Sequence, residues 1–174
     1  MPFYPGPGLG GHCIPIDPHY LAWKLRTLNY TARFIQLATE VNFGMPEYWV
    51  TKVQDALNEH GKALKGSNIL VLGVTYKADV ADIRESPALD IIDNLREKGA
   101  KVQYHDPYVP TLSTTTIQLS SINENSFYQI LMQADCVIVV INHSSYQWEK
   151  IEEKALAIVD TRNALGYLKQ ATHS

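Results

Sequence analysis

The sequence predicts an α/β fold in which a helical segment is followed by a doubly wound, mainly parallel sheet of the Rossmann-like type. Two observations lead to this prediction. Residues 69–74 and 136–141 are continuous apolar runs, the form taken by strands buried on both faces of a parallel sheet. Segments with helical spacing alternate with such runs, whereas the chain before them shows only helix and loop patterns. We therefore divide the chain into a helical part, 1–62, and an α/β part, 63–174.

The composition limits the class of protein. The chain has 174 residues, of which 45% are hydrophobic, and a formal net charge of -3. It can bury a full core, and its charge favours neither a nucleic-acid nor a membrane partner. No apolar run approaches the roughly 20 residues that span a bilayer, and no secretory signal is recognisable. The two cysteines lie in dissimilar settings, which argues against a disulfide, and Cys136 is expected in the core. We expect a cytoplasmic protein.

A glycine-rich stretch lies close to the first residue. Gly6, Gly8 and Gly11 match the G-x-G-x-x-G pattern, which binds dinucleotides only when it joins a strand to a helix. Only five residues precede the pattern and two prolines follow within seven residues, so this function is disfavoured. The stretch instead predicts a stiff loop that presents Cys13 as a nucleophile, with Asp17 nearby. A turn with a structural cysteine is the alternative.

Two helical segments are expected in the first part of the chain. Residues 19–28 predict a short helix with a proline near its start. Residues Ala32–His60 predict one long amphipathic helix or two in line, because Gly44 and Pro46 must kink or break it. This helix carries more aromatic surface than one small domain covers, so we expect it to form a homodimer interface. Packing against its own domain is the alternative.

The α/β part begins with the apolar strand at 69–74. Ser86 and Pro87 then favour a helix start, and the next strand, 101–105, completes a βαβ unit. Residues 110–125 are rich in Thr and Ser and predict a loop. The remaining expected elements are a short helix at 127–133, a strand at 136–141, a loop with a short helix at 144–154 and a strand at 156–160.

Polar residues follow each predicted strand, at the edge where open parallel sheets bind ligands. These candidates are Tyr76, Lys77, Asp79, Asp82 and Arg84 after the first strand, His105 and Asp106 after the second, Asn142 and His143 after the third, and Thr161 and Arg162 after the fourth. Lys77, Arg84 and Arg162 would place three cations on one rim, which suits a diphosphate. The alternative is that Lys77 and Arg84 pair with the acidic residues between 79 and 85. No glycine fingerprint follows the first strand, which leaves a mononucleotide or a nucleotide-sugar as the ligand.

Several stretches resemble one known family. Residues 6–18 (GPGLGGHCIPIDP) resemble the catalytic-cysteine segment of the UDP-glucose/GDP-mannose dehydrogenase family. Residues 73–77 (GVTYK), 82–87 (DIRESP) and 104–107 (YHDP) resemble its UDP-binding domain, and 38–52 its central dimerisation helix. The sequence of the cysteine segment is most similar to that of the bacterial UDP-N-acetylglucosamine 6-dehydrogenases. The UDP-glucose enzymes usually carry Lys where this chain has Ile16, so the resemblance favours an N-acetylhexosamine.

The resemblance implies a reaction and a role for each matched residue. The family oxidises the C6 alcohol of a nucleotide-sugar to a carboxylate with two NAD, through a cysteine thioester. The implied catalytic residues are Cys13, the nucleophile, and Asp17, which orients or activates the hydrolytic water. The implied UDP-sugar contacts are Gly8, Gly10, Gly11, Tyr76, Lys77 and Arg162, and the implied contact to the NAD pyrophosphate is Arg84.

The resemblance also implies that the NAD-binding domain of the family is missing from this chain. Family members carry an N-terminal domain with the true NAD fingerprint, and no such pattern occurs here. We therefore expect a C-terminal portion that binds most of the NAD elsewhere and is inactive alone. The alternative is an independent UDP-sugar-binding or dimerisation module without catalysis.

Overall fold

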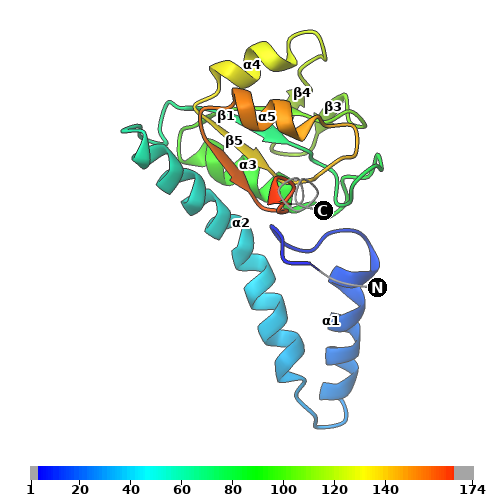
Figure 1. The fold of residues 1–174 in the computed structure, drawn as a ribbon. Coiled ribbons are helices and arrows are strands. Elements are labelled where there is room, and N and C mark those ends of the chain that lie inside the picture. The colour runs from blue at the N-terminus through cyan, green and yellow to red at the C-terminus, as the bar shows by residue number, and fades with distance from the viewer. Residues whose placement is uncertain (1–3, 167–174) are drawn as a thin grey trace, which may run out of the picture.

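The computed structural model describes residues 4–166, in which a parallel sheet flanked by helices stands beside a projecting pair of helices (Figure 1). The elements in order are α1 (Cys13–Arg26), α2 (Arg33–Glu59), β1 (Asn68–Leu72), α3 (Pro87–Glu97), β2 (Lys101–His105), β3 (Thr111–Ser113), β4 (Gln118–Ser120), α4 (Phe127–Gln133), β5 (Cys136–Val139), α5 (Trp148–Lys154) and β6 (Ile158–Asp160).

The main sheet has the order β2-β1-β5-β6, and every neighbouring pair is parallel. Alternate residues of β1 face opposite sides, as the two-residue period of a strand requires. Ile69 and Val71 pack with side chains of α2 and α3, whereas Leu70 and Leu72 pack with side chains of α4 and α5. Helices therefore cover both faces, and the predicted doubly wound α/β fold is confirmed.

The predicted βαβ unit forms from β1, α3 and β2. The side chain of Ser86 accepts a hydrogen bond from the backbone N–H of Ala88 at 3.3 Å, and Pro87 is the first helical residue. This is the expected capping arrangement, because the N–H groups of a first helical turn have no partner within the helix.

The first helix differs from its prediction, whereas the second agrees with one of the two predicted alternatives. The first helix begins at Cys13 and not at residue 19. Pro15 costs it nothing, because the N–H groups of the first turn are not needed for helical bonds. The second is one long helix, and it runs through Gly44 and Pro46 without a break.

Residues 111–120 also differ from the loop predicted at 110–125. They form a short antiparallel hairpin in which Leu112 pairs with Leu119. Leu112 and Ile117 are buried in the core, which holds the hairpin in place. Strands of three residues are too short to produce a clear alternating pattern in the sequence.

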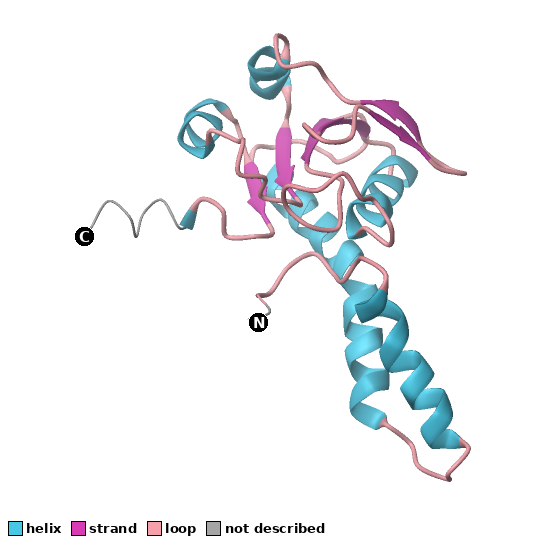
Figure 2. Cartoon of the chain, turned by 90° about the vertical axis from the view of Figure 1, so that its right-hand side faces the viewer, coloured by secondary structure: helices cyan, strands magenta, loops and turns pink. Residues whose placement is uncertain are grey.

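The helix α2 belongs to both parts of the molecule. Val50, Val53 and Leu57 in its second half are fully buried against the sheet. Its first half projects with α1 as a helical hairpin (Figure 2). The division into domains 1–62 and 63–174 stays a prediction.

The projecting hairpin carries large exposed apolar side chains. They are Ile14, Ile16, Tyr20, Leu21, Trp23, Leu28, Tyr30, Phe34, Leu37, Val41, Phe43 and Tyr48. Between residues 4 and 166, no helix has both the length and the apolar character required to cross a lipid bilayer. Exposed apolar side chains gathered on one projecting segment are typical of an interaction site.

Candidate functional site

The glycine-rich loop lies against the carboxyl edge of the sheet. The backbone N–H of Gly11 donates to the carbonyl of Arg84 at 3.0 Å. A Cβ atom on Gly10 would come within 2.6 Å of the Glu85 carbonyl oxygen and 2.8 Å of the Tyr76 Cβ, so the loop can lie this close only without a side chain there. The loop that precedes the cysteine is thereby brought to the turn that follows β1.

The last strand contributes to the same place. A Cβ atom on Gly6 would come within 2.5 Å of the Arg162 guanidinium, and the indole N–H of Trp49 in α2 donates to the Gly6 carbonyl at 3.4 Å. Gly8 lies against Pro87 at the start of α3. The structure therefore gathers the loop, the β1 turn and the residue after β6 around one rim.

Cys13 is exposed and is the first residue of α1. The unpaired N–H groups at a helix start favour negative charge at this position. Its sulfur lies 3.9 Å from Nδ1 of His12, the residue before it in the sequence. Asp17 lies four residues further along the same helix, which places both side chains on one face.

The three rim cations differ in their surroundings. The Arg84 guanidinium is held by Asp82, with Nε at 3.1 Å from both carboxylate oxygens and Nη2 at 2.6 Å from Oδ2. Asp82 raises the pKa of Arg84, and Tyr76 and Cys13 add smaller effects of the same sign. Arg84 thus follows the alternative in which rim cations pair with nearby carboxylates.

Arg162 and Lys77 differ from Arg84 in this respect. Within the described residues, neither takes part in an ion pair with a carboxylate. Arg162 is half-buried, its Nε donates to the Val140 carbonyl at 2.9 Å, and burial lowers its pKa. Lys77 is exposed at the tip of the β1 turn. A desolvated guanidinium without a carboxylate is suited to bind an anion.

A buried polar network lies behind this rim. Burial alone would raise the pKa of Asp106, but hydrogen bonds from His143, Val74 and Tyr108 outweigh it and hold that pKa below its usual value. His143 is fully buried and bonds both Asp106 and the backbone of Asp79. Both residues follow strands and were candidates on that ground, but no sequence pattern indicated that they pair.

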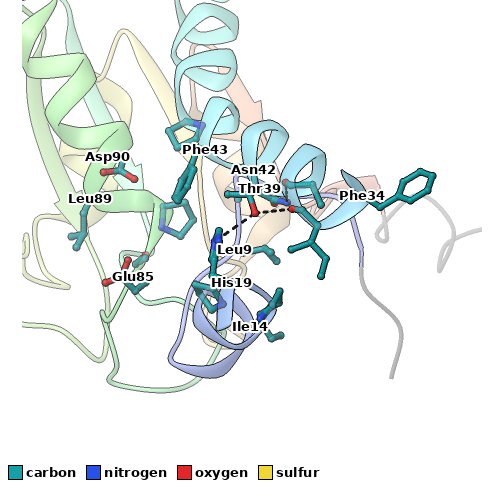
Figure 3. A pocket seen from close by; sticks show the side chains of 18 residues that line it. Leu9, Ile14, His19, Phe34, Thr39, Asn42, Phe43, Glu85, Leu89 and Asp90 are labelled. Atoms are coloured by element: carbon teal, nitrogen blue, oxygen red, sulfur yellow. Dashed lines mark hydrogen bonds between the residues drawn. The ribbon is translucent and has the colours of Figure 1, made fainter. Parts of the chain in front are cut away.

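A cavity of about 500 Å³ lies beside the rim, between α1, α2 and the start of α3, and Gly8 and Glu85 are among the residues that line it (Figure 3). Its walls are mainly apolar, and on one side Thr39 lies 3.5 Å from a ring nitrogen of His19. Cys13, Lys77 and Arg162 do not line it. No group of His, Cys, Asp and Glu side chains in the part of the chain that the structure describes could hold a metal ion.

A parallel α/β sheet whose carboxyl edge carries a glycine-rich loop and unpaired cations defines an α/β ligand-binding domain. The chain belongs to the UDP-glucose/GDP-mannose dehydrogenase family. Residues 70–167 match the UDP binding domain of that family, and residues 1–43 match its central domain. The family expected from the sequence is confirmed.

Similar proteins carry related names. The chain is 34% identical over 171 residues to a UDP-N-acetyl-D-mannosamine dehydrogenase of Methanococcus vannielii, with 94% of this chain and 37% of the relative covered. It is 36% identical over 170 residues to a UDP-glucose 6-dehydrogenase of Rickettsia bellii, covering 92% and 38%. A crystal structure of an NDP-N-acetyl-D-galactosaminuronic acid dehydrogenase from Methanosarcina mazei matches with a TM-score of 0.78 at 27% identity, covering 93% and 36%. The chain thus spans little more than a third of each of these relatives.

Proposed function

We propose that this chain supplies the catalytic cysteine and the UDP-sugar site of an NAD-dependent nucleotide-sugar 6-dehydrogenase. The observation that carries the proposal is the contact between the loop before Cys13 and the rim that holds Lys77 and Arg162. It joins a nucleophile to an anion site in a family whose matched domain binds UDP. The relatives named as UDP-sugar dehydrogenases support the same activity.

The diphosphate of the substrate would lie between Lys77 and Arg162. Both cations lack a carboxylate partner among residues 4–166. Two positive charges match the charge of a diphosphate diester, and Arg162 binds more strongly because its burial weakens competition from water. Gly8, Gly10 and Gly11 would lie against the sugar side of the ligand, with the backbone N–H groups of Gly8 and Gly10 as donors, because the Gly11 N–H already donates to the Arg84 carbonyl.

The chemistry assigned to this chain is nucleophilic. NAD, when bound, accepts the hydrides that leave C6. The Cys13 sulfur forms a bond to C6 at the aldehyde level, which holds the carbon in place until the second hydride has left. Water oriented by Asp17 then adds to the resulting acyl carbon, the C–S bond breaks, and the free thiol and the carboxylate are released.

The cofactor contact of this chain is small. Arg84 is exposed on the rim and would reach the NAD pyrophosphate after its bond to Asp82 rearranges. We assign the rest of the NAD site to another part of the intact enzyme.

The substrate, assembly and location are part of the same proposal. Ile16 in place of a lysine supports a UDP-N-acetylhexosamine, such as the N-acetylglucosamine form, over UDP-glucose. The exposed apolar side chains of the projecting hairpin support a homodimer through α2. Two free cysteines suit a reducing compartment, in keeping with the cytoplasm.

Calorimetry with UDP, UDP-N-acetylglucosamine and UDP-glucose tests the site. We expect the chain to bind UDP weakly and to turn over nothing with NAD. Arg162→Gln removes one charge-assisted contact and should weaken UDP binding by about tenfold or more. Asp135→Asn is the control, because it likewise removes one charge, and the ion pair of Asp135 with Lys62 lies away from the rim. Equal UDP affinity in the Arg162 variant and the wild type would contradict the proposal.

A further inference from the structure

A fully buried histidine lies directly behind the turn that carries Lys77. The side chains of His143 and Asp106 are both 0% exposed, and His143 Nε2 lies 3.0 Å from Asp106 Oδ2. On the other side of the ring, Nδ1 of His143 lies 3.0 Å from the backbone nitrogen of Asp79. The imidazole therefore connects the end of β2 to the turn after β1.

The hydrogen-bond partners of the His143 ring fix its tautomer. A backbone N–H can only donate, so Nδ1 must be the accepting nitrogen and carries no proton. The proton of the neutral ring then lies on Nε2, from which it is donated to Asp106. Asp106 also accepts the N–H groups of Val74 at 2.7 Å and Tyr108 at 2.8 Å. Both carboxylate oxygens are thus engaged, and the ring has one orientation.

The turn that this ring supports has an unfavourable backbone conformation. Asp79 has a φ of 61°, in the left-handed region that residues other than glycine rarely adopt. Such a residue persists only where its surroundings hold it. The Oδ1 of Asp79 accepts the N–H of Ser144 at 2.9 Å, and the hydroxyl of Thr75 donates to the Lys77 carbonyl at 2.8 Å.

We propose that His143 is a positioning residue for nucleotide binding. By accepting the Asp79 amide it holds the β1 turn in the conformation that directs Lys77 to the diphosphate. Two apolar side chains of the same volume would fill this space without the cost of desolvating the Asp106 carboxylate. The role of the His143–Asp106 pair is therefore to fix the conformation of the turn after β1 and not only to fill space. The inference rests on the proposed UDP site.

Two substitutions separate the two hydrogen bonds of the ring. His143→Asn places a side-chain oxygen near the position of Nδ1 and keeps an acceptor for the Asp79 amide. His143→Gln places its NH₂ near the position of Nε2, keeps the donor to Asp106 and loses that acceptor. Calorimetry with UDP should show a loss of about tenfold or more for His143→Gln and a loss below about threefold for His143→Asn.

The double variant His143→Gln/Lys77→Met distinguishes positioning from general destabilisation. If His143 acts through Lys77, the double variant binds UDP no more weakly than Lys77→Met alone. Fully additive losses would overturn the inference and leave the proposed function intact. Absence of UDP binding by the wild type would overturn both.

The tautomer of His143 can be measured directly in the wild-type protein, so this test does not depend on whether a variant folds. Long-range ¹H–¹⁵N NMR of the His143 ring should show Nδ1 without a proton and Nε2 with one at pH 7. A proton on Nδ1 would overturn the inference, because the Asp79 amide would then have no acceptor.

Discussion

Replacement of Gly10 by alanine should separate the glycine-rich loop from the rim without unfolding the sheet. The new Cβ would lie 2.6 Å from the Glu85 carbonyl oxygen and 2.8 Å from the Tyr76 Cβ, and neither atom is the far end of a flexible side chain. Glu85 has a φ of 49°, so its carbonyl cannot turn aside without further strain. The loop, which lies near the start of the chain, must move instead.

The size of the effect follows from the cost of overpacking. An added methyl group in a filled site costs about 1–3 kcal/mol, which corresponds to a loss of UDP affinity of about 5- to 150-fold if the loop must be docked for binding. Calorimetry with UDP measures the affinity, and urea unfolding measures the stability of the sheet. We expect the affinity to fall and the free energy of unfolding to change little.

Gly44→Ala is the matched control for this experiment. Gly44 lies within α2, and a Cβ there would meet nothing within 4 Å. The change should raise the free energy of unfolding by about 1 kcal/mol and leave UDP affinity unchanged. Wild-type UDP affinity in the Gly10→Ala variant would refute the argument that the docked loop completes the site.

Three further outcomes are expected. In the complete enzyme, Cys13→Ser should abolish formation of the sugar acid and keep UDP affinity, and normal acid formation would exclude Cys13 as the nucleophile. Burial lowers the pKa of His105 below 6.5, so the unfolded chain takes up this proton first and the free energy of unfolding should fall as the pH drops through about 6.5. His105→Gln should flatten that part of the pH profile of the free energy of unfolding, measured with urea. An unchanged profile would contradict the lowered pKa of His105. Phe34, 88% exposed on the hairpin, should lie in the dimer contact, so Phe34→Ser should shift sedimentation from dimer towards monomer, and a monomeric wild type would contradict the dimer.

The parts of the fold that the sequence predicted are those with strong local signals. The buried strand predicted at 69–74 is present as Asn68–Leu72, and the Ser86–Pro87 helix start and the βαβ unit are present as well, because each depends on neighbouring residues. The start of α1 was predicted too late because its prolines resemble a helix boundary, although Pro15 lies where no backbone donor is needed. The hairpin at 111–120 was missed because burial of Leu112 against distant residues decides it.

The candidate site, too, was predictable from the sequence only where the signal is local. Position after a strand was sufficient to identify Lys77, Arg84 and Arg162 as rim candidates. Which of them is held by a carboxylate depends on side-chain geometry, and the sequence offered the Arg84–Asp82 pair only as one of several alternatives. The bond between His143 and Asp106 joins residues 37 positions apart in sequence. No local pattern encodes a contact of that range.

The helix α2 has a mechanical consequence. Its second half is anchored in the core through Val50, Val53 and Leu57, while its first half stands outside the domain. Trp49, at the boundary, bonds the Gly6 carbonyl of the loop that leads to Cys13. A second subunit or an adjoining domain that moves the outer half of α2 would therefore also move the cysteine loop, because Trp49 connects the two. Assembly and the alignment of the nucleophile would then be one event and not two.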